Sequence, residues 1–374
     1  MRFEGPVLII FHGARRDRGV EALVTRARIA AGREAAASAL AAGFEAVIVA
    51  TDTPDEFDTA APGIFVEADP PDIEFRLDHR LREIVKRYGL MKPAVMGAGA
   101  VPLLGTAEFQ LIAEQLNQRD GRFITNNFFS GDLTAWTPGD AIERVGAFTR
   151  DNLLPRRLRD EAGLVPVVLP RTTATQFDLD TPADLCVLAV QERLSAGLRA
   201  AIDAETLPLG PYRATMRVLC DAGAELIVSG RVGSQSWHYL ERETACKVRL
   251  FSEERGMAAA GATHLPRSLV GYMLDDVGPE RFFERMAAMG DALVVDTRVL
   301  EAHAGVAPSR EDRFLGDLFR ADEIHEPFLR RLTEAAAAAP IPVLAGGHSL
   351  VSGGLMALND IAWLENDRRE GLIR

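Results

Sequence analysis

Residues 6–19 read PVLIIFHGARRDRG, and an alanine-rich helical pattern over residues 20–42 separates them from a second apolar run, EAVIVA, at residues 45–50. Unbroken apolar runs that alternate with helical patterns are typical of strands buried in a parallel sheet with helices on both faces. The alternation continues through apolar runs at residues 63–67, 94–96, 122–126 and 165–169 and helical patterns at residues 73–88, 106–117 and 181–192. We therefore predict an α/β fold with a mostly parallel sheet for the first half.

A segment rich in proline and glycine, residues 198–211, interrupts the alternation before it starts again. Such residues often mark loops between elements or domains. We predict two domains, one over residues 1–204 and a smaller Rossmann-like α/β domain over residues 205–374. Strands of the second domain are expected at residues 225–228, 247–251, 292–295 and 341–344.

The amino-acid composition indicates which classes of binding partner are disfavoured. The 374 residues carry 42 Lys and Arg against 54 Asp and Glu, a formal charge of −12, and only three of the positive charges are lysines. This balance disfavours binding to bulk nucleic acid or to an anionic membrane. Three widely spaced cysteines fit a reducing cytoplasm better than a disulfide framework. We expect a cytoplasmic protein without targeting or membrane-spanning segments that binds small molecules, and a homo-oligomer is compatible with this composition.

The end of the first predicted strand carries the first candidate binding residues. They are His12, Gly13, Arg15, Arg16 and Arg18. Ligands of open α/β sheets bind beyond the carboxyl ends of the strands, and guanidinium groups bind phosphate oxygens in a bidentate fork. We interpret this loop as a candidate phosphate-binding or nucleotide-binding loop. The competing interpretation is a solvated loop in an arginine-rich chain.

Two further strand ends in the first half are candidate parts of a pocket. Gly97 and Gly99 follow a strand, and Asn126 and Asn127 end another. The sequence GAG resembles a dinucleotide fingerprint, but its sixth position is Pro102, so we disfavour an NAD site. A tight turn that lets a substrate approach the backbone is the alternative. Adjacent amides are poor strand formers, so residues 126 and 127 are expected in a loop or pocket wall.

The second half repeats the arrangement of polar residues after strands. Candidate anion-binding residues there are Ser229, Gly230, Arg231, Gly346, Gly347, His348 and Ser349. Backbone N–H groups between a strand and a helix can hold an anion, and arginine can neutralise its charge. The alternative is that glycine and serine simply populate the connections between strands and helices.

Three segments, taken in order, resemble nucleotidyltransferases of the glycosyltransferase-A-like fold, in the style of molybdenum-cofactor guanylyltransferase and 2-phospho-lactate guanylyltransferase. They are VLIIFHGARRDRG at residues 7–19, GAGAVPLLGTAEFQLIAEQL at residues 97–116 and FDLDTPADL at residues 177–185. The resemblance covers roughly residues 5–195, half of the chain. The third segment is the most specific, because it is close to the family's Asp-x-Asp-Thr-Pro-x-Asp-Leu.

The resemblance implies transfer of a nucleotidyl group from a nucleoside triphosphate, with Mg²⁺ as cofactor. The chain departs from the family at two positions of one site. Ala100 stands where the family has a metal-binding aspartate, and the loop lysine has no counterpart because the first lysine is Lys86. Alanine has no oxygen for a hard cation. Other carboxylates are then expected to serve, with Asp52 and Asp180 as catalytic candidates and Asp132 and Asp180 as metal ligands.

Two functions follow from these observations. The first is a nucleotidyltransferase-like protein that transfers a nucleotidyl group to a small anionic acceptor, whose oxygen attacks the α-phosphorus in line. The second is a catalytically degenerate nucleotidyltransferase-like module, with anionic-ligand binding or chemistry in the C-terminal domain. The combined loss at Ala100 and at the loop lysine is what makes the second a competitor to the first.

Overall fold

The computed structural model describes residues 2–13, 17–57, 61–70, 74–148, 151–191, 194–202, 206–253 and 266–373. The chain divides into two compact units. Unit 1 comprises Met1–Asp17 and Thr25–Gln176, and unit 2 comprises Arg18–Val24 and Phe177–Arg374. The boundary predicted between residues 204 and 205 therefore falls within unit 2. In the part of the chain that the structure describes, no helix is long and apolar enough to cross a membrane.

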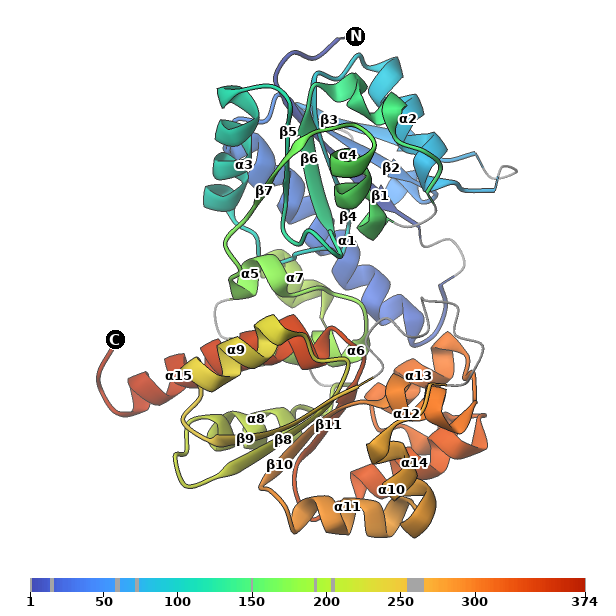
Figure 1. Ribbon diagram of the computed structural model, residues 1–374, viewed down its shortest axis with the longest axis vertical. Coiled ribbons are helices and arrows are strands. Elements are labelled where there is room, and N and C mark those ends of the chain that lie inside the picture. Colours follow the sequence, from blue (N-terminus) through green and yellow to red (C-terminus); the bar gives the residue numbers. More distant parts are fainter. Residues whose placement is uncertain are drawn as a thin grey trace. The chain divides into compact units, whose positions relative to one another are not determined.

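Unit 1 is built on a seven-stranded sheet with the order β3-β2-β1-β4-β6-β5-β7 (Figure 1). Its strands are β1 (Pro6–His12), β2 (Ala46–Thr51), β3 (Ile64–Ala68), β4 (Lys92–Gly97), β5 (Arg122–Thr125), β6 (Leu133–Thr137) and β7 (Val165–Val168). All described pairings are parallel except those of β6, which runs antiparallel to both β4 and β5. The predicted mostly parallel sheet is confirmed, but the sequence analysis missed β6, a short strand that is buried along its whole length.

Helices cover both faces of this sheet. They are α1 (Glu21–Ala41), α2 (Leu77–Arg87), α3 (Thr106–Gln118), α4 (Leu154–Asp160) and α5 (Thr173–Gln176), with short 3₁₀ turns at Pro54–Glu56, Gly139–Arg144 and Asp151–Leu153. Alternate residues of β1 face opposite sides, as the two-residue period of a strand requires. Leu8 and Ile10 pack with α1 and α3, whereas Val7 and Ile9 pack with α2 and α4.

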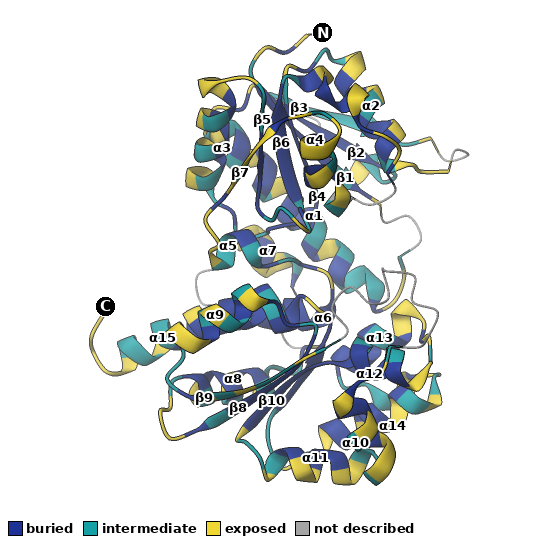
Figure 2. Ribbon diagram, in the orientation of Figure 1, coloured by how far each residue is buried: buried dark blue, intermediate teal, exposed yellow. Residues whose placement is uncertain are grey.

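Unit 2 is built on a four-stranded, fully parallel sheet with the order β11-β10-β8-β9. The strands are β8 (Glu225–Gly230), β9 (Lys247–Ser252), β10 (Ala292–Asp296) and β11 (Val343–Gly346). Each overlaps a strand predicted from the sequence. The result is a second α/β unit, as predicted, and Figure 2 shows that its central strands β8 and β10 are buried.

The helices of unit 2 include several that the sequence analysis did not separate. They are α6 (Pro182–Ala189), α7 (Ala196–Ala201), α8 (Leu209–Leu219), α9 (Ser234–Glu243), α10 (Leu269–Val277), α11 (Pro279–Ala287), α12 (Thr297–Ala304), α13 (Arg310–Asp317), α14 (Pro327–Ala337) and α15 (Leu355–Arg369). A 3₁₀ turn at Ala321–Glu323 and a π-helical turn at Leu350–Gly354 complete them. Gly210 and Pro211 belong to the segment predicted as a loop between domains. They lie in the first turn of α8, where proline is tolerated.

Candidate functional site

The candidate site of unit 1 lies at the carboxyl edge of its sheet. On one side of β1 the sheet continues with β2 and then β3. On the other side β1 pairs with β4, so the strand order reverses between β1 and β4. Open α/β sheets bind ligands at such a reversal, beyond the carboxyl ends of the strands. His12 ends β1, Thr51 ends β2 and Gly97 ends β4. Two of the predicted binding residues, His12 and Gly97, therefore lie at this edge.

His12 is a buried polar side chain at the end of β1. The residue is 7% exposed, its ring meets Phe57 edge-on at 5.6 Å, and Nε2 has no hydrogen-bond partner among the residues described. Burial, and next the positive charge of Arg28, lower the pKa of His12 to about 4, against opposing contributions from Asp52 and Asp17. The imidazole is neutral at pH 7, so it can donate or accept a hydrogen bond.

Arg28 and Asp17 are site residues that the sequence analysis missed. Both are close enough to His12 to shift its pKa, and so is Asp52, which directly follows β2. One residue in the sequence could have indicated that this part of α1 lies near the site. It is Gly32, one helical turn after Arg28. A Cβ at Gly32 would lie 3.1 Å from the Cβ of Ala98, so α1 approaches the turn after β4 closely. A glycine inside a helix is a recognised sign of such a close contact.

Backbone hydrogen bonds hold the turn after β4 and join it to β1. The N–H of Ala98 donates to the carbonyl of Phe11 at 3.0 Å, and that of Ala100 to Gly97 at 3.1 Å. Val101 has φ +41°, which is strained for a β-branched residue and is typical of functional loops. Ala100 is 6% exposed and belongs to the apolar core with Leu104.

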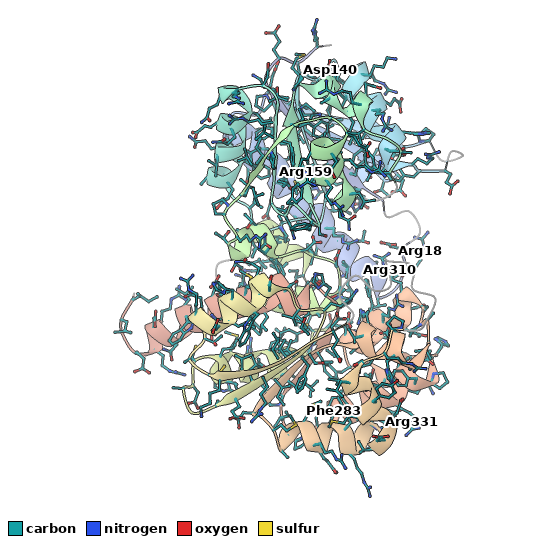
Figure 3. The ribbon with its side chains drawn as sticks, in the orientation of Figure 1. Arg18, Asp140, Arg159, Phe283, Arg310 and Arg331 are labelled. Atoms are coloured by element: carbon teal, nitrogen blue, oxygen red, sulfur yellow. The ribbon has the colours of Figure 1, made fainter. Side chains whose placement is uncertain are left out.

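The two glycines at the strand ends leave this edge open. Among the residues that the structure describes, none lies within 4 Å of a Cβ placed on Gly13 or on Gly97, whereas Gly99 is buried within the turn. These residues therefore leave room for a ligand near the backbone at the ends of β1 and β4. Arg15 and Arg16 lie outside the described residues. Arg18 is exposed and belongs to unit 2 (Figure 3).

The side chain of Asn126 hydrogen-bonds the β5–β6 connection and α5 of unit 1. Its Nδ2 donates to Asp132 Oδ2 and to the carbonyl of Thr175, each at 3.0 Å. Its Oδ1 accepts the N–H groups of Asp132 at 3.0 Å and Leu133 at 3.1 Å. Because these four bonds use every donor and acceptor of the amide, Asn126 holds the β5–β6 connection. Asn127 also bonds locally, accepting the N–H of Phe129 at 3.1 Å.

The segment FDLDTPADL lies in unit 2 and joins α6 to the loop after β11. Asp184 is 0% exposed, and its Oδ2 accepts the N–H groups of Asp180 at 2.9 Å and Thr181 at 2.8 Å. The same oxygen accepts the hydroxyl of Ser349 at 2.8 Å. Burial, and next the charge of Asp180, raise the pKa of Asp184 to about 7. Asp180 itself is exposed, and its N–H supports the helix start.

The strand order of unit 2 reverses between β8 and β10, and Arg231 lies at that edge. Its Nε donates to Asp296 Oδ2 at 2.6 Å and its Nη2 to Oδ1 at 3.1 Å, a bidentate ion pair on a carboxylate that is 0% exposed. Gly230, at φ +140°, makes this geometry possible, because a Cβ there would lie 2.3 Å from the Cβ of Asp296. The preceding Ser229 is buried.

The loop after β11 is tied to the same edge of unit 2. The carbonyl of Gly346 accepts the Thr297 hydroxyl at 3.4 Å, and a Cβ on Gly347 would lie 3.9 Å from Arg298 Nε. Arg298 in turn holds Asp317 through two bonds of 2.6 and 2.9 Å. His348 is exposed, and its carbonyl accepts the Ser352 hydroxyl at 2.7 Å.

The carboxylates expected to hold Mg²⁺ are divided between the two units. Asp52 and Asp132 belong to unit 1, whereas Asp180 belongs to unit 2. Across the described ranges, no three His, Cys, Asp or Glu side chains gather where they could hold a metal ion. Ala100 also offers no oxygen to the edge of β4.

Comparisons with known proteins find only distant similarity to solved structures. No family model and no curated protein matches the chain. A nucleotide-diphospho-sugar transferase candidate from Desulfovibrio desulfuricans aligns at TM-score 0.38 and 15% identity, over 52% of this chain and 93% of that one. A nucleotidyl transferase from Methanothermobacter thermautotroptrophicus aligns at 0.35 and 16%, over 46% and 91%. A cytidylyltransferase from Leptospira borgpetersenii aligns at 0.37 and 17%, over 54% and 91%. Likenesses this distant carry no argument about chemistry.

Proposed function

We propose that this protein is nucleotidyltransferase-like and that unit 1 binds a nucleotide at the carboxyl edge of β1 and β4. The observation that carries the proposal is the buried Nε2 of His12, which lacks a hydrogen-bond partner among the described residues at the reversal of the strand order. An unpaired buried polar atom costs about 1–3 kcal/mol, so buried polar groups nearly always have a hydrogen-bond partner. A ligand at this edge would be that partner.

The surroundings of His12 favour a phosphorylated ligand. Arg28 places a positive charge close to the imidazole, and the neutral His12 can donate to a phosphate or ribose oxygen. Gly13 and Gly97 leave room for close approach to the backbone, where N–H groups favour anions. Because this set contains no metal ligand at position 100, we propose that binding does not require Mg²⁺.

Transfer of a nucleotidyl group to a small anionic acceptor is the second candidate. It is favoured by Asp17 and Asp52, two carboxylates close enough to His12 to raise its pKa. Such an activity would require Mg²⁺. Its protein ligands would have to be other than a cluster of three His, Cys, Asp or Glu side chains, since the described residues form no such cluster. Metal dependence therefore separates the two candidates.

The first test measures binding of GTP, CTP and ATP by thermal shift and calorimetry, each with Mg²⁺ and with EDTA. We expect stabilisation of about 2.7 kcal/mol at a hundredfold excess over Kd, equal in both conditions. The Arg28→Gln substitution should weaken binding about tenfold or more, because a charge-assisted bond is lost. Arg26→Gln is the matched control, since Arg26 is exposed on the same helix.

Each outcome of this test is decisive. Stabilisation only with Mg²⁺, together with release of pyrophosphate, would support the transferase instead. If no nucleotide binds in either condition, or if Arg26→Gln weakens binding as much as Arg28→Gln, the proposed site in unit 1 is wrong.

A further inference from the structure

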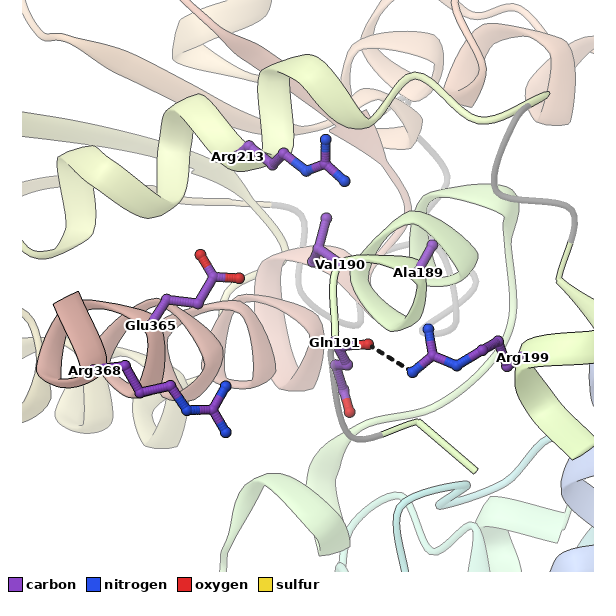
Figure 4. Close-up of a pocket in the computed structure, with 7 residues that line it drawn as sticks. All are labelled: Ala189, Val190, Gln191, Arg199, Arg213, Glu365 and Arg368. Carbon is purple, nitrogen blue, oxygen red and sulfur yellow. Dashed lines mark hydrogen bonds between the residues drawn. The ribbon is translucent and has the colours of Figure 1, made fainter. Parts of the chain in front are cut away.

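Unit 2 contains a pocket whose lining residues differ from those at its strand edge. Its volume is about 500 Å³, within the range of small-molecule sites. Figure 4 shows its walls, which come from the end of α6, from α7, from α8 and from α15. The lining residues are Ala189, Val190, Gln191, Arg199, Arg213, Glu365 and Arg368. None of them belongs to the nucleotide site proposed for unit 1.

The charges of this pocket favour an anion. Three of its lining side chains are guanidinium groups and one is a carboxylate. The guanidinium groups come from three different helices. In Figure 4, Arg213 lies beside Val190, whereas Arg199 and Arg368 extend toward Gln191. Three arginines against one glutamate leave an excess of two positive charges in the lining set.

Packing explains why these side chains face the pocket. On α8, Tyr212, Thr215 and Met216 are buried, so the exposed Arg213 projects from the opposite face of the helix. Arg213 forms no hydrogen bond or ion pair within the described part of the chain. The Nη2 of Arg199 donates to the carbonyl of Gln191 at 3.5 Å, which orients one guanidinium at the end of α6.

We propose that the pocket formed by α6, α7, α8 and α15 binds a small polyanion, whose phosphoryl or carboxylate oxygens accept hydrogen bonds from Arg213, Arg199 and Arg368. Guanidinium groups match both kinds of oxygen in a bidentate fork. The single carboxylate, Glu365, repels an anionic ligand, so its removal is expected to strengthen binding.

The test uses calorimetry on the full chain with pyrophosphate and, separately, citrate, so that the two arms distinguish phosphoryl from carboxylate ligands. All variants are made in an Arg28→Gln background, in which the proposed nucleotide site of unit 1 is weakened, so that binding to the pocket of unit 2 dominates the measurement. We expect Arg213→Gln to weaken binding about tenfold or more. Glu365→Gln should tighten it about twofold to fivefold, because a like charge is removed.

Arg217→Gln is the matched control, because Arg217 is exposed on α8 and does not line the pocket. Its Kd should equal that of the parent, and raising NaCl from about 0.05 to 0.5 M should weaken binding in the parent. Absence of binding by both anions overturns the proposal, and so does a Kd that is unchanged in Arg213→Gln. A failed nucleotide site in unit 1 leaves these readouts intact, so the two failures are distinguishable.

Discussion

At the scale of single residues, His12 shows how a strand end combines burial with a polar group. A buried imidazole is common in cores, but it normally has a hydrogen-bond partner. Here the residue is 7% exposed, and Nε2 lacks a partner among the residues described. Sequence reasoning found the residue from its place after an apolar run. Its burial and the proximity of Arg28 on α1 depend on tertiary packing, whereas Asp17 is already near in the sequence.

The low pKa of His12 predicts acid sensitivity of unit 1. The folded-state pKa is about 4 and the unfolded value is 6.5. Between these values the unfolded state takes up a proton that the folded state does not, so stability falls as pH drops from 6.5 toward 4. The full loss is about 3 kcal/mol, and it is absent above pH 6.5. His12→Gln should remove this pH dependence.

Urea denaturation between pH 7.5 and 4.5 measures this effect. Trp136 is the tryptophan of unit 1, so a Trp237→Phe, Trp363→Phe background makes its fluorescence specific for that unit. His79→Gln serves as the control, because His79 is exposed in the same unit. Equal pH slopes for wild type and His12→Gln would contradict the prediction.

At the scale of elements, Asp184 joins α6 to the loop after β11. One buried oxygen accepts hydrogen bonds from the helix start and from Ser349. The pattern Thr-Pro-x-Asp predicts only the local half of this arrangement, as a capping residue of a helix. The bond to Ser349 spans 165 residues of sequence, so no local pattern could indicate it.

Substitutions at Asp184 should separate its hydrogen bonds from its charge. Asp184→Ala leaves the Ser349 hydroxyl and two N–H groups without their acceptor, and we expect it to cost about 3 kcal/mol at pH 7.5. Asp184→Asn keeps one acceptor oxygen and should cost less than about 1 kcal/mol. Ser349→Ala, alone and combined with Asp184→Ala, completes a double-mutant cycle that measures the coupling.

The pH dependence of Asp184 runs opposite to that of His12. Its pKa is raised from 3.8 to about 7, so the folded state keeps a proton that the unfolded state has lost. The stabilisation is fully present below pH 3.8 and is lost as pH rises through 7. Denaturation of unit 2 should show a shallower slope in Asp184→Asn than in wild type. The slope that remains includes that of Asp317, because burial raises the pKa of Asp317 to about 6. Equal slopes in the two proteins would refute the assignment.

At the scale of the whole molecule, the division into units differs from the sequence-based boundary. Residues 177–202 pack with unit 2, and Arg18–Val24 also belong to it. Pro208 and Pro211 suggested a linker, but they mark the beginning of α8. Proline is compatible with both a loop and a first helical turn, so its position alone could not decide between them.

Fragments with different starting points test this division. A fragment over residues 177–374 keeps α6 with its Asp184–Ser349 bond, whereas one over residues 205–374 lacks it. We expect the longer fragment to unfold cooperatively at a higher temperature, because α6 buries Leu185, Val187 and Leu188. Differential scanning calorimetry and circular dichroism measure the difference. Equal transitions in both fragments would show that α6 does not belong to the core of unit 2.

The sequence by itself determined the α/β class, the buried strands β1, β2, β8 and β10, and most helices. Apolar runs and helical periodicity are local properties that a single sequence displays. Only the tertiary structure decided that β6 lies antiparallel between β4 and β5 and that FDLDTPADL belongs to unit 2. The surroundings of His12 and the convergence of Arg199, Arg213 and Arg368 also depend on contacts between distant segments. Such contacts arise from packing of whole elements, which local patterns do not encode.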